Sequence, residues 1–225
     1  MSFLYEEKAS RSRFVDVVWH TLDTSDGTYL ASADACWDMI FTRASDGCRV
    51  LLSGPSSKPT TVQYTAGNRN VGVRFLTGAY FTHVAASAMF DRTVALPMLS
   101  ESTFELGGRE WELPHYDDID DFLDELADVG LLADDTVVTA AVIGAGETVS
   151  ARSVQRHFSR VIGLSPQQVH QVARAREAVA RLQSGEAIAD VAYALGYADQ
   201  AHMTRDVKRL TGFTPGQTKQ RHEPV

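Results

Sequence analysis

Two short polar stretches decide the fold of the C-terminal third of the chain: Ser150–Ile162 (SARSVQRHFSRVI) and Asp199–Leu210 (DQAHMTRDVKRL). Each predicts an amphipathic helix, because its apolar residues recur at helical spacing and would lie on one side. These inward stripes are Val154, Phe158 and Ile162 in the first helix and Met203, Val207 and Leu210 in the second. Basic and polar side chains are left for the outer faces.

A long helix is predicted between these two stretches. Ser165 precedes Pro166, and Gln168 follows three residues after the serine, which is a strong helix-start signal. The helix is expected to run to Gly185 and to be roughly 28 Å long, close to the spacing of about 34 Å between successive major-groove faces. A short apolar helix is predicted before each of the two basic helices: Thr136–Ile143 before the first and Ile188–Leu195 before the second. Asp134 or Asp135 would cap the helix at Thr136–Ile143. The pattern predicts two helix-turn-helix units.

The outward residues of the two basic helices suit contacts with DNA. Arginine can donate two hydrogen bonds to guanine, and glutamine can both donate to and accept from adenine. Lysine, arginine and helix N-terminal amides suit phosphates, which fix register rather than sequence. The candidate DNA-binding residues are Arg152, Gln155, Arg156 and Arg160 in the first helix, and Gln200, Ala201, Thr204, Arg205 and Lys208 in the second.

The charge distribution supports this interpretation, although the net charge of −8 at first argues against nucleic acid. Residues 150–225 hold 11 Lys and Arg against six Asp and Glu, whereas residues 1–149 hold 10 against 23. A basic third on an acidic chain is the asymmetry expected when only one domain meets phosphate.

The N-terminal part is predicted to be mainly β. Short β-branched and aromatic runs follow one another at roughly 8–12 residues, separated by turn signals such as Asp26-Gly27 and Asp46-Gly47. The runs are Phe14–His20, Trp37–Phe41, Arg49–Ser53, Thr61–Tyr64 and Val71–Phe75, with a helix near Ala85–Phe90. The fold class is therefore α+β: a β-rich sandwich or barrel followed by an all-α domain with two helix-turn-helix motifs on a long helix.

An acidic segment separates the two parts. No Lys or Arg occurs from Glu110 to Ala151, and Asp117–Leu132 has the apolar spacing of a helix. A solvated helix joining two domains is the simpler interpretation, and an acidic mimic of DNA is the alternative. The predicted domains are a sensory or dimerisation domain at 1–112, an acidic linker helix at 113–133 and the DNA-binding domain at 134–225.

Catalytic and metal-binding patterns are weak. Cys36 and Cys48 form neither a disulfide framework nor a zinc cluster, and the histidines are scattered, so we expect no catalytic residues, metal or cofactor. No signal peptide and no apolar run long enough for a membrane span is recognised, so we expect a cytoplasmic protein. Five residues could line an effector pocket, with core packing as the alternative for the aromatic ones: Trp19, His20, Trp37, Arg74 and Phe75.

In the two basic helices and the long helix between them, the chain resembles the AraC/XylS family of bacterial transcription regulators. The matching signature begins with Ser150-x-Arg152-x-Val154-Gln155-Arg156-x-Phe158, Gly163-Leu164-Ser165-Pro166 and Arg174-x-x-x-Ala178. It continues with Ile188-x-x-Val191-Ala192, Leu195-Gly196-Tyr197-x-Asp199-Gln200, Thr204-Arg205-x-x-Lys208-Arg209 and Gly212-x-Thr214-Pro215. The family differs from this chain in its tighter first turn, where this chain has Gly144–Val149, and in residue type at Val169, Val207, Thr218 and Lys219.

The resemblance implies two helix-turn-helix motifs and a β-rich sensory domain, which is cupin-like in the best-known members. It implies a sequence-specific regulator that binds double-stranded DNA, with a small-molecule effector, RNA polymerase and a second copy of the chain as further candidate partners. An enzyme carrying this DNA-binding domain, such as a DNA-repair methyltransferase, is the main alternative. A protein-interaction module that has lost DNA binding is another, and the retained Gln155, Arg156 and Arg205 argue against it.

Overall fold

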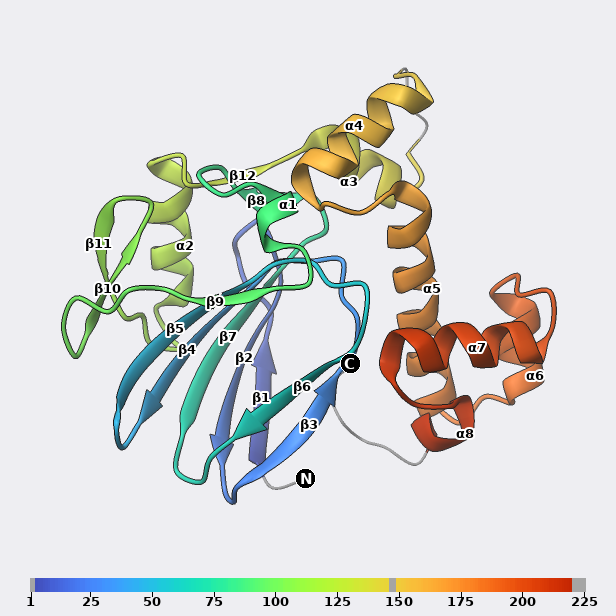
Figure 1. Ribbon diagram of the computed structural model, residues 1–225, viewed down its shortest axis with the longest axis horizontal. Coiled ribbons are helices and arrows are strands. Elements are labelled where there is room, and N and C mark those ends of the chain that lie inside the picture. Colours follow the sequence, from blue (N-terminus) through green and yellow to red (C-terminus); the bar gives the residue numbers. More distant parts are fainter. Residues whose placement is uncertain (1–2, 146–148, 220–225) are drawn as a thin grey trace. The chain divides into compact units, whose positions relative to one another are not determined.

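The computed structural model describes residues 3–145 and 149–219, and in these residues a strand-rich region is followed by helices (Figure 1). The predicted α+β class and order of its two parts are confirmed. The turn before the first basic helix, predicted at Gly144–Val149, lies partly outside the described residues.

A six-stranded antiparallel sheet is the largest element of the strand-rich region. Its strands, from one edge to the other, are β1 (Phe3–Lys8), β2 (Val15–Asp23), β7 (Arg69–Phe75), β4 (Asp38–Ala44), β5 (Gly47–Ser53) and β9 (Thr93–Ala95). Three two-stranded ladders accompany it: β3 (Gly27–Ala31) with β6 (Thr60–Tyr64), β8 (Ala79–Phe81) with β12 (Leu132–Asp134), and β10 (Thr103–Leu106) with β11 (Arg109–Glu112).

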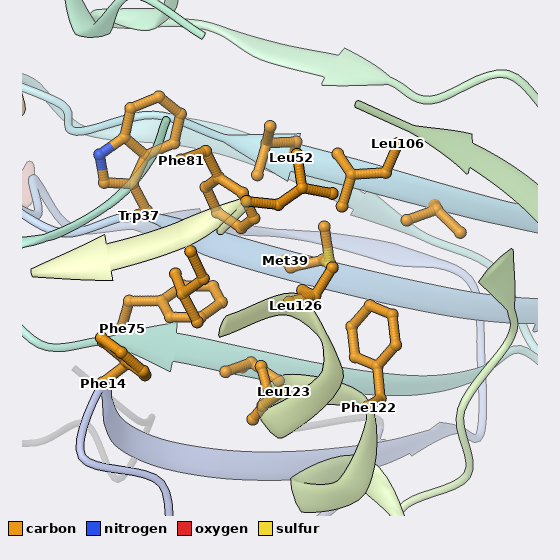
Figure 2. Packing of buried hydrophobic residues seen from close by; sticks show 14 of the residues in the cluster. Phe14, Trp37, Met39, Leu52, Phe75, Phe81, Leu106, Phe122, Leu123 and Leu126 are labelled. Carbon is orange, nitrogen blue, oxygen red and sulfur yellow. The ribbon is translucent and has the colours of Figure 1, made fainter. Parts of the chain in front are cut away.

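One face of this sheet forms the main hydrophobic core. Alternate residues of the central strands, such as Met39, Phe41 and Val73, are fully buried, as the two-residue period of a strand requires. Helix α2 (Ile119–Asp128) covers them with Phe122, Leu123 and Leu126 (Figure 2). The predicted acidic helix therefore exists, and its apolar stripe is part of the sheet's core.

The other helices are short except one. They are α1 (Ala86–Met89), α3 (Thr136–Val142), α4 (Ala151–Val161), α5 (Pro166–Gln183), α6 (Ile188–Ala194), α7 (Gln200–Thr211) and α8 (Pro215–Thr218). The predicted capping box at Ser165 and Gln168 is present at the start of α5. Asp135 caps α3 and Asp199 caps α7 through their side chains, which settles the choice between Asp134 and Asp135. No helix in the described part of the chain is both long and apolar enough to cross a membrane.

The molecule divides into two compact units that do not coincide with the predicted domains. The first holds the described residues up to Gly27, Cys36–Pro55 and Gln63–Gly163, so it includes α3 and α4. The second holds Thr28–Ala35, Ser56–Val62 and the described residues from Leu164 onward. The boundaries 1–112, 113–133 and 134–225 stay a prediction.

A close approach at Gly72 gives a first testable prediction. Gly72 lies in β7 opposite Trp19 of β2, and a Cβ there would lie 2.1 Å from the indole ring. We expect Gly72→Ala to lower the free energy of unfolding by about 1 kcal/mol, at the low end for overpacking, because Trp19 is half-exposed and its ring can turn outward.

Chemical denaturation measures this change, and Gly216→Ala is the control, since a Cβ at Gly216 has no atom within 4 Å. Adding Trp19→Ala should remove most of the extra cost of Gly72→Ala. An equal effect of Gly72→Ala with and without the indole would contradict the steric explanation.

Candidate nucleic-acid interface

The first basic helix, α4, buries its apolar stripe and exposes its polar face. Phe158, Val161 and Ile162 are at most 2% exposed, and Val154 is half-buried. Arg152, Gln155 and Arg156 are exposed on the outer side, as the sequence pattern predicts. A polar face above a buried stripe leaves these three side chains available to a partner of opposite charge.

The first unit holds α4 in place at several points. The indole N–H of Trp37 donates a hydrogen bond to the carbonyl of Val161, the last residue of α4, at 3.2 Å. A carbonyl at this position has no partner within its own helix, so the indole satisfies it. Gly163, at φ +78°, follows the helix, and a Cβ there would be 3.5 Å from the carbonyl oxygen of Ala86 in α1.

Asp135 ties α3 to α4. One of its oxygens accepts hydrogen bonds from the amides of Val137 and Val138. The other accepts from His157 at 2.7 Å and from Arg160 at 2.5 Å. Although burial alone would raise the pKa of this carboxyl, the hydrogen bonds from His157 and Arg160 hold it below its usual range.

This network gives Arg160 a partner that sequence reasoning did not predict. The guanidinium of Arg160 pairs with Asp135, whose side chain is only 2% exposed, and it lies 5.8 Å from the ring centroid of Tyr80. Contact with a phosphate would compete with that buried carboxylate. The predicted phosphate contact by Arg160 therefore stays a prediction, and the geometry favours a structural role.

The second basic helix, α7, has the same division into two faces. Met203, Val207 and Leu210 are at most 2% exposed and pack in the core of the second unit, as predicted. The candidate DNA-binding residues of this helix keep their outward positions, with Thr204 half-buried and the others exposed: Gln200, Ala201, Arg205 and Lys208. The hydroxyl of Thr204 donates to the carbonyl of Gln200 at 2.8 Å.

A network of ion pairs centred on Asp206 joins α5 to α7. Arg174 contacts Asp206 at 3.2 Å, and its guanidinium carbon lies 4.0 Å from the ring centroid of Tyr197. His202 and Arg209 also approach the carboxylate of Asp206, at 3.6 and 3.3 Å. This geometry gives Arg174, a residue of the matching signature, a structural role as an ion-pair partner. Sequence reasoning missed the network, because its members are up to 35 residues apart.

The five candidate effector residues do not lie on one face of the sheet. Trp19 and His20 are neighbours in β2, as Arg74 and Phe75 are in β7, so each pair points to opposite faces. Trp37 and Phe75 are at most 1% exposed, and both pack against Phe81 in the core. Core packing, the alternative interpretation of these two aromatic residues, agrees with their burial.

Arg74 pairs with Asp38 at 3.5 Å, whereas the ring of His20 lies 4.5 Å from that of Tyr116. The indole ring of Trp19 lies over Gly72, on the face of the sheet opposite to that of His20. A single effector pocket formed by all five residues is a prediction that the arrangement does not support.

The C-terminal region matches a known protein family. Residues 145–221 match the family model described as "Helix-turn-helix domain". The match agrees with the AraC-type helix-turn-helix domain that the sequence resemblance predicts, and it supports a DNA-binding transcription regulator.

Solved structures of ToxT from Vibrio cholerae resemble the chain as a whole. One, a P21 crystal form at 1.65 Å resolution, is 11% identical over 96% of this chain and 97% of that chain, with a TM-score of 0.45. Another, from V. cholerae O395, is 11% identical over 100% and 99%, with a TM-score of 0.42. Similarities of this size carry no argument about function. No curated protein matches the chain in sequence.

Proposed function

We propose that the chain is a sequence-specific transcription regulator that reads two adjacent segments of double-stranded DNA with α4 and α7. One observation carries the proposal: each helix buries an apolar stripe and presents an exposed row of polar and basic side chains from its N-terminal half. A recognition helix enters the major groove with that half leading.

The roles of individual residues follow from their chemistry. Arg156 and Arg205 suit bidentate contacts with guanine, and Gln155 and Gln200 suit adenine. Ala201 and the methyl group of Thr204 suit apolar contact with thymine, whereas Arg152 and Lys208 suit phosphates. Arg160 is left out of this set because of its pairing with Asp135.

The first experiment selects bound fragments from genomic DNA with the purified full-length protein. We expect enrichment of fragments that share a bipartite sequence, because both helices read bases. Fragments no more alike than the input library would contradict sequence-specific reading. The enriched site then serves as the cognate duplex in the binding measurements on wild-type and variant proteins.

Salt dependence gives a second prediction, on Lys208. Each phosphate contact releases counterions, so affinity for the cognate duplex should fall steeply with salt. Lys208→Ala should reduce the slope of log affinity against log salt by about 1 and should weaken cognate and unrelated duplexes equally. Binding titrations over a salt series measure both quantities.

The matched control is Lys219→Ala, which removes a lysine on α8's C-terminal side that hydrogen-bonds the carbonyl of Gly185. An unchanged slope in Lys208→Ala, or a loss confined to the cognate duplex, would remove Lys208 from the phosphate contacts.

The strand-rich region is proposed to sense a small molecule, and contacts with RNA polymerase and with a second copy of the chain are further parts of the proposal. Repeating the fragment selection with metabolites from cell extract tests the sensing role. A change in the enriched fragments, or in their affinity, would identify an extract that contains the effector. A titration of the cognate duplex in the analytical ultracentrifuge gives the number of chains bound.

The enzyme alternative depends on a reactive thiol. Cys36 is buried with its sulfur 3.2 Å from the hydroxyl of Thr77, and Cys48 is half-buried against the core. Over the described ranges, no group of three or more His, Cys, Asp or Glu side chains could hold a metal. Alkylation of the thiols should leave DNA binding unchanged, and a thiol-dependent loss of alkyl groups from modified DNA would favour the enzyme.

A further inference from the structure

Two segments from the N-terminal half of the sequence belong to the same compact unit as α7. They are Thr28–Ala35 and Ser56–Val62, and together we call them the strap. Hydrogen bonds join them to each other: the amide of Asp34 donates to the hydroxyl of Ser56 at 3.0 Å, and the amide of Ser56 donates to the carbonyl of Asp34 at 2.6 Å. The strap is thus one structural element.

The strap provides a hydrogen-bond donor for a carbonyl at the C-terminal end of α7. The amide of Ala33 donates a hydrogen bond to the carbonyl of Leu210 at 2.7 Å. Leu210 lies in the last turn of α7, where carbonyls have no partner within the helix. The backbone of the strap therefore takes part in ending the second recognition helix.

The same end of α7 is in close van der Waals contact with the strap. Gly212, in the left-handed conformation at φ +82°, terminates the helix. A Cβ there would lie 2.1 Å from Leu30 Cδ2 and 3.7 Å from Pro59 Cγ, one residue from each segment of the strap. A side chain at position 212 would displace the end of the Leu30 side chain as well as strain the backbone.

A partly buried ion pair ties the strap to α5. Asp34 Oδ2 lies 3.4 Å from Arg176 Nη1, and the two side chains are 12% and 27% exposed. Since α5 packs along α7 through the Arg174–Asp206 pair, the strap contacts both α7 and the long helix that supports it. Partial burial makes this pair less screened by salt than a surface pair.

The strap leaves the outer face of α7 uncovered, because Gln200, Arg205 and Lys208 remain exposed. The hydrogen bond from Ala33 and the close approach at Gly212 both lie at the C-terminal end of the helix. The strap therefore leaves the proposed reading face free, and its contacts can act on DNA binding by fixing the direction in which that face points.

We propose that the strap positions α7 for DNA, with Asp34 and Arg176 as positioning residues, so that the strand-rich region sets the affinity of the second motif. The inference rests on the proposed function. The strap is continuous with the sheet, since β4 begins three residues after Ala35 and β5 ends three residues before Ser56. Those two strands pair directly, with Asp38 opposite Ser53.

A double-mutant cycle in the full-length chain tests the proposal. The variants are Asp34→Asn, Arg176→Gln and the double variant, and none of them alters a residue of the reading face. Each single variant should bind the cognate duplex roughly fivefold more weakly, the lower end of coupling between distant sites, and the double variant no more weakly than either single one. Asp134→Asn, which removes an ion pair with Arg13 in the first unit, is the control.

Two further measurements separate positioning from simple stabilisation. Base substitutions in the DNA segment whose recognition depends on Arg205 should cost the Asp34→Asn protein less than wild type, while substitutions in the other segment should cost both equally. In the Asp34→Asn protein, the amide hydrogens at the C-terminal end of α7 should exchange faster than in the wild type.

A lower melting temperature with unchanged affinity and unchanged base preferences would overturn the proposal, as would an equal loss over both DNA segments. Failure of the wild-type protein to bind any duplex would instead reject the proposed function. In that case the exchange of the α7 amides in Asp34→Asn still reports whether the strap holds the helix.

Discussion

Replacing Arg205 with alanine is expected to weaken binding to the cognate duplex by about 1–3 kcal/mol, or roughly fivefold to 150-fold, and to relax the base preference at one position. Arg205 is exposed on the outer face of α7, whose buried stripe of Met203 and Val207 fixes the direction of that face. Alanine cannot donate the two hydrogen bonds that arginine gives to a guanine, so the penalty should depend on the base at that position.

The measurement compares cognate and singly substituted duplexes for the wild type and the variant. Arg156→Ala should behave in the same way at the segment read by α4. Arg181→Ala is the matched control, because it removes an arginine of α5 that pairs with Glu177 and Glu186. Unchanged binding in both Arg156→Ala and Arg205→Ala would reject α4 and α7 as recognition helices.

Replacing Asp135 with alanine is expected to lower the free energy of unfolding by about 3 kcal/mol. The change removes the N-terminal cap of α3, worth about 1 kcal/mol, and the buried hydrogen bonds from His157 and Arg160. Chemical denaturation at pH 7 measures the loss. Asp134→Ala is the control, since this neighbouring aspartate pairs with Arg13, which is 76% exposed, and a surface pair contributes little.

The contribution of Asp135 should depend on pH in a defined direction. Its pKa is lower in the folded chain than its usual value of about 4, so the stabilisation is fully present above pH 4 and is lost as the pH falls further. The difference between wild type and Asp135→Ala should therefore stay constant from pH 7 to pH 5 and shrink below about pH 4. A difference that already shrank above pH 5 would contradict the assignment of this stabilisation to the Asp135 carboxylate.

The helical region could be predicted closely because its signals are local. Ser165, Pro166 and Gln168 specify the start of α5 within four residues, and Asp199 caps α7 from the adjacent position. The buried stripe of α7 follows from helical periodicity alone, and that of α4 follows in part, because Val154 is half-buried and Val161 joins the buried residues. Such features need no knowledge of the rest of the chain.

The strand-rich region shows what local patterns miss. Strand β1 is absent from the sequence prediction, because it is an edge strand whose central residues are exposed, so its sequence lacks the apolar alternation that marks a strand. The two-residue period of a strand places Trp19 and His20 on opposite faces of β2, so the pattern itself gives no support to one pocket lined by all five candidate effector residues.

Tertiary contacts explain the rest of the difference. Asp135 could be predicted as a cap, but its partners His157 and Arg160 lie 22 and 25 residues away. The division into compact units depends on the packing of the strap, which comes from far earlier in the sequence than α7. Neither contact leaves a periodic signal in the sequence.

One short run of chain, Ala33–Trp37, donates a hydrogen bond to a carbonyl at the C-terminal end of α7 and to another at the C-terminal end of α4. The amide of Ala33 holds the end of α7, and the indole of Trp37 holds the end of α4. The two donors are of different kinds, a backbone group and a side chain, so the run is constrained in length as well as in composition. An insertion or deletion between residues 33 and 37 would disturb the hydrogen bond at the end of α7, the one at the end of α4, or both, which makes this loop an unsuitable place for grafts or tags.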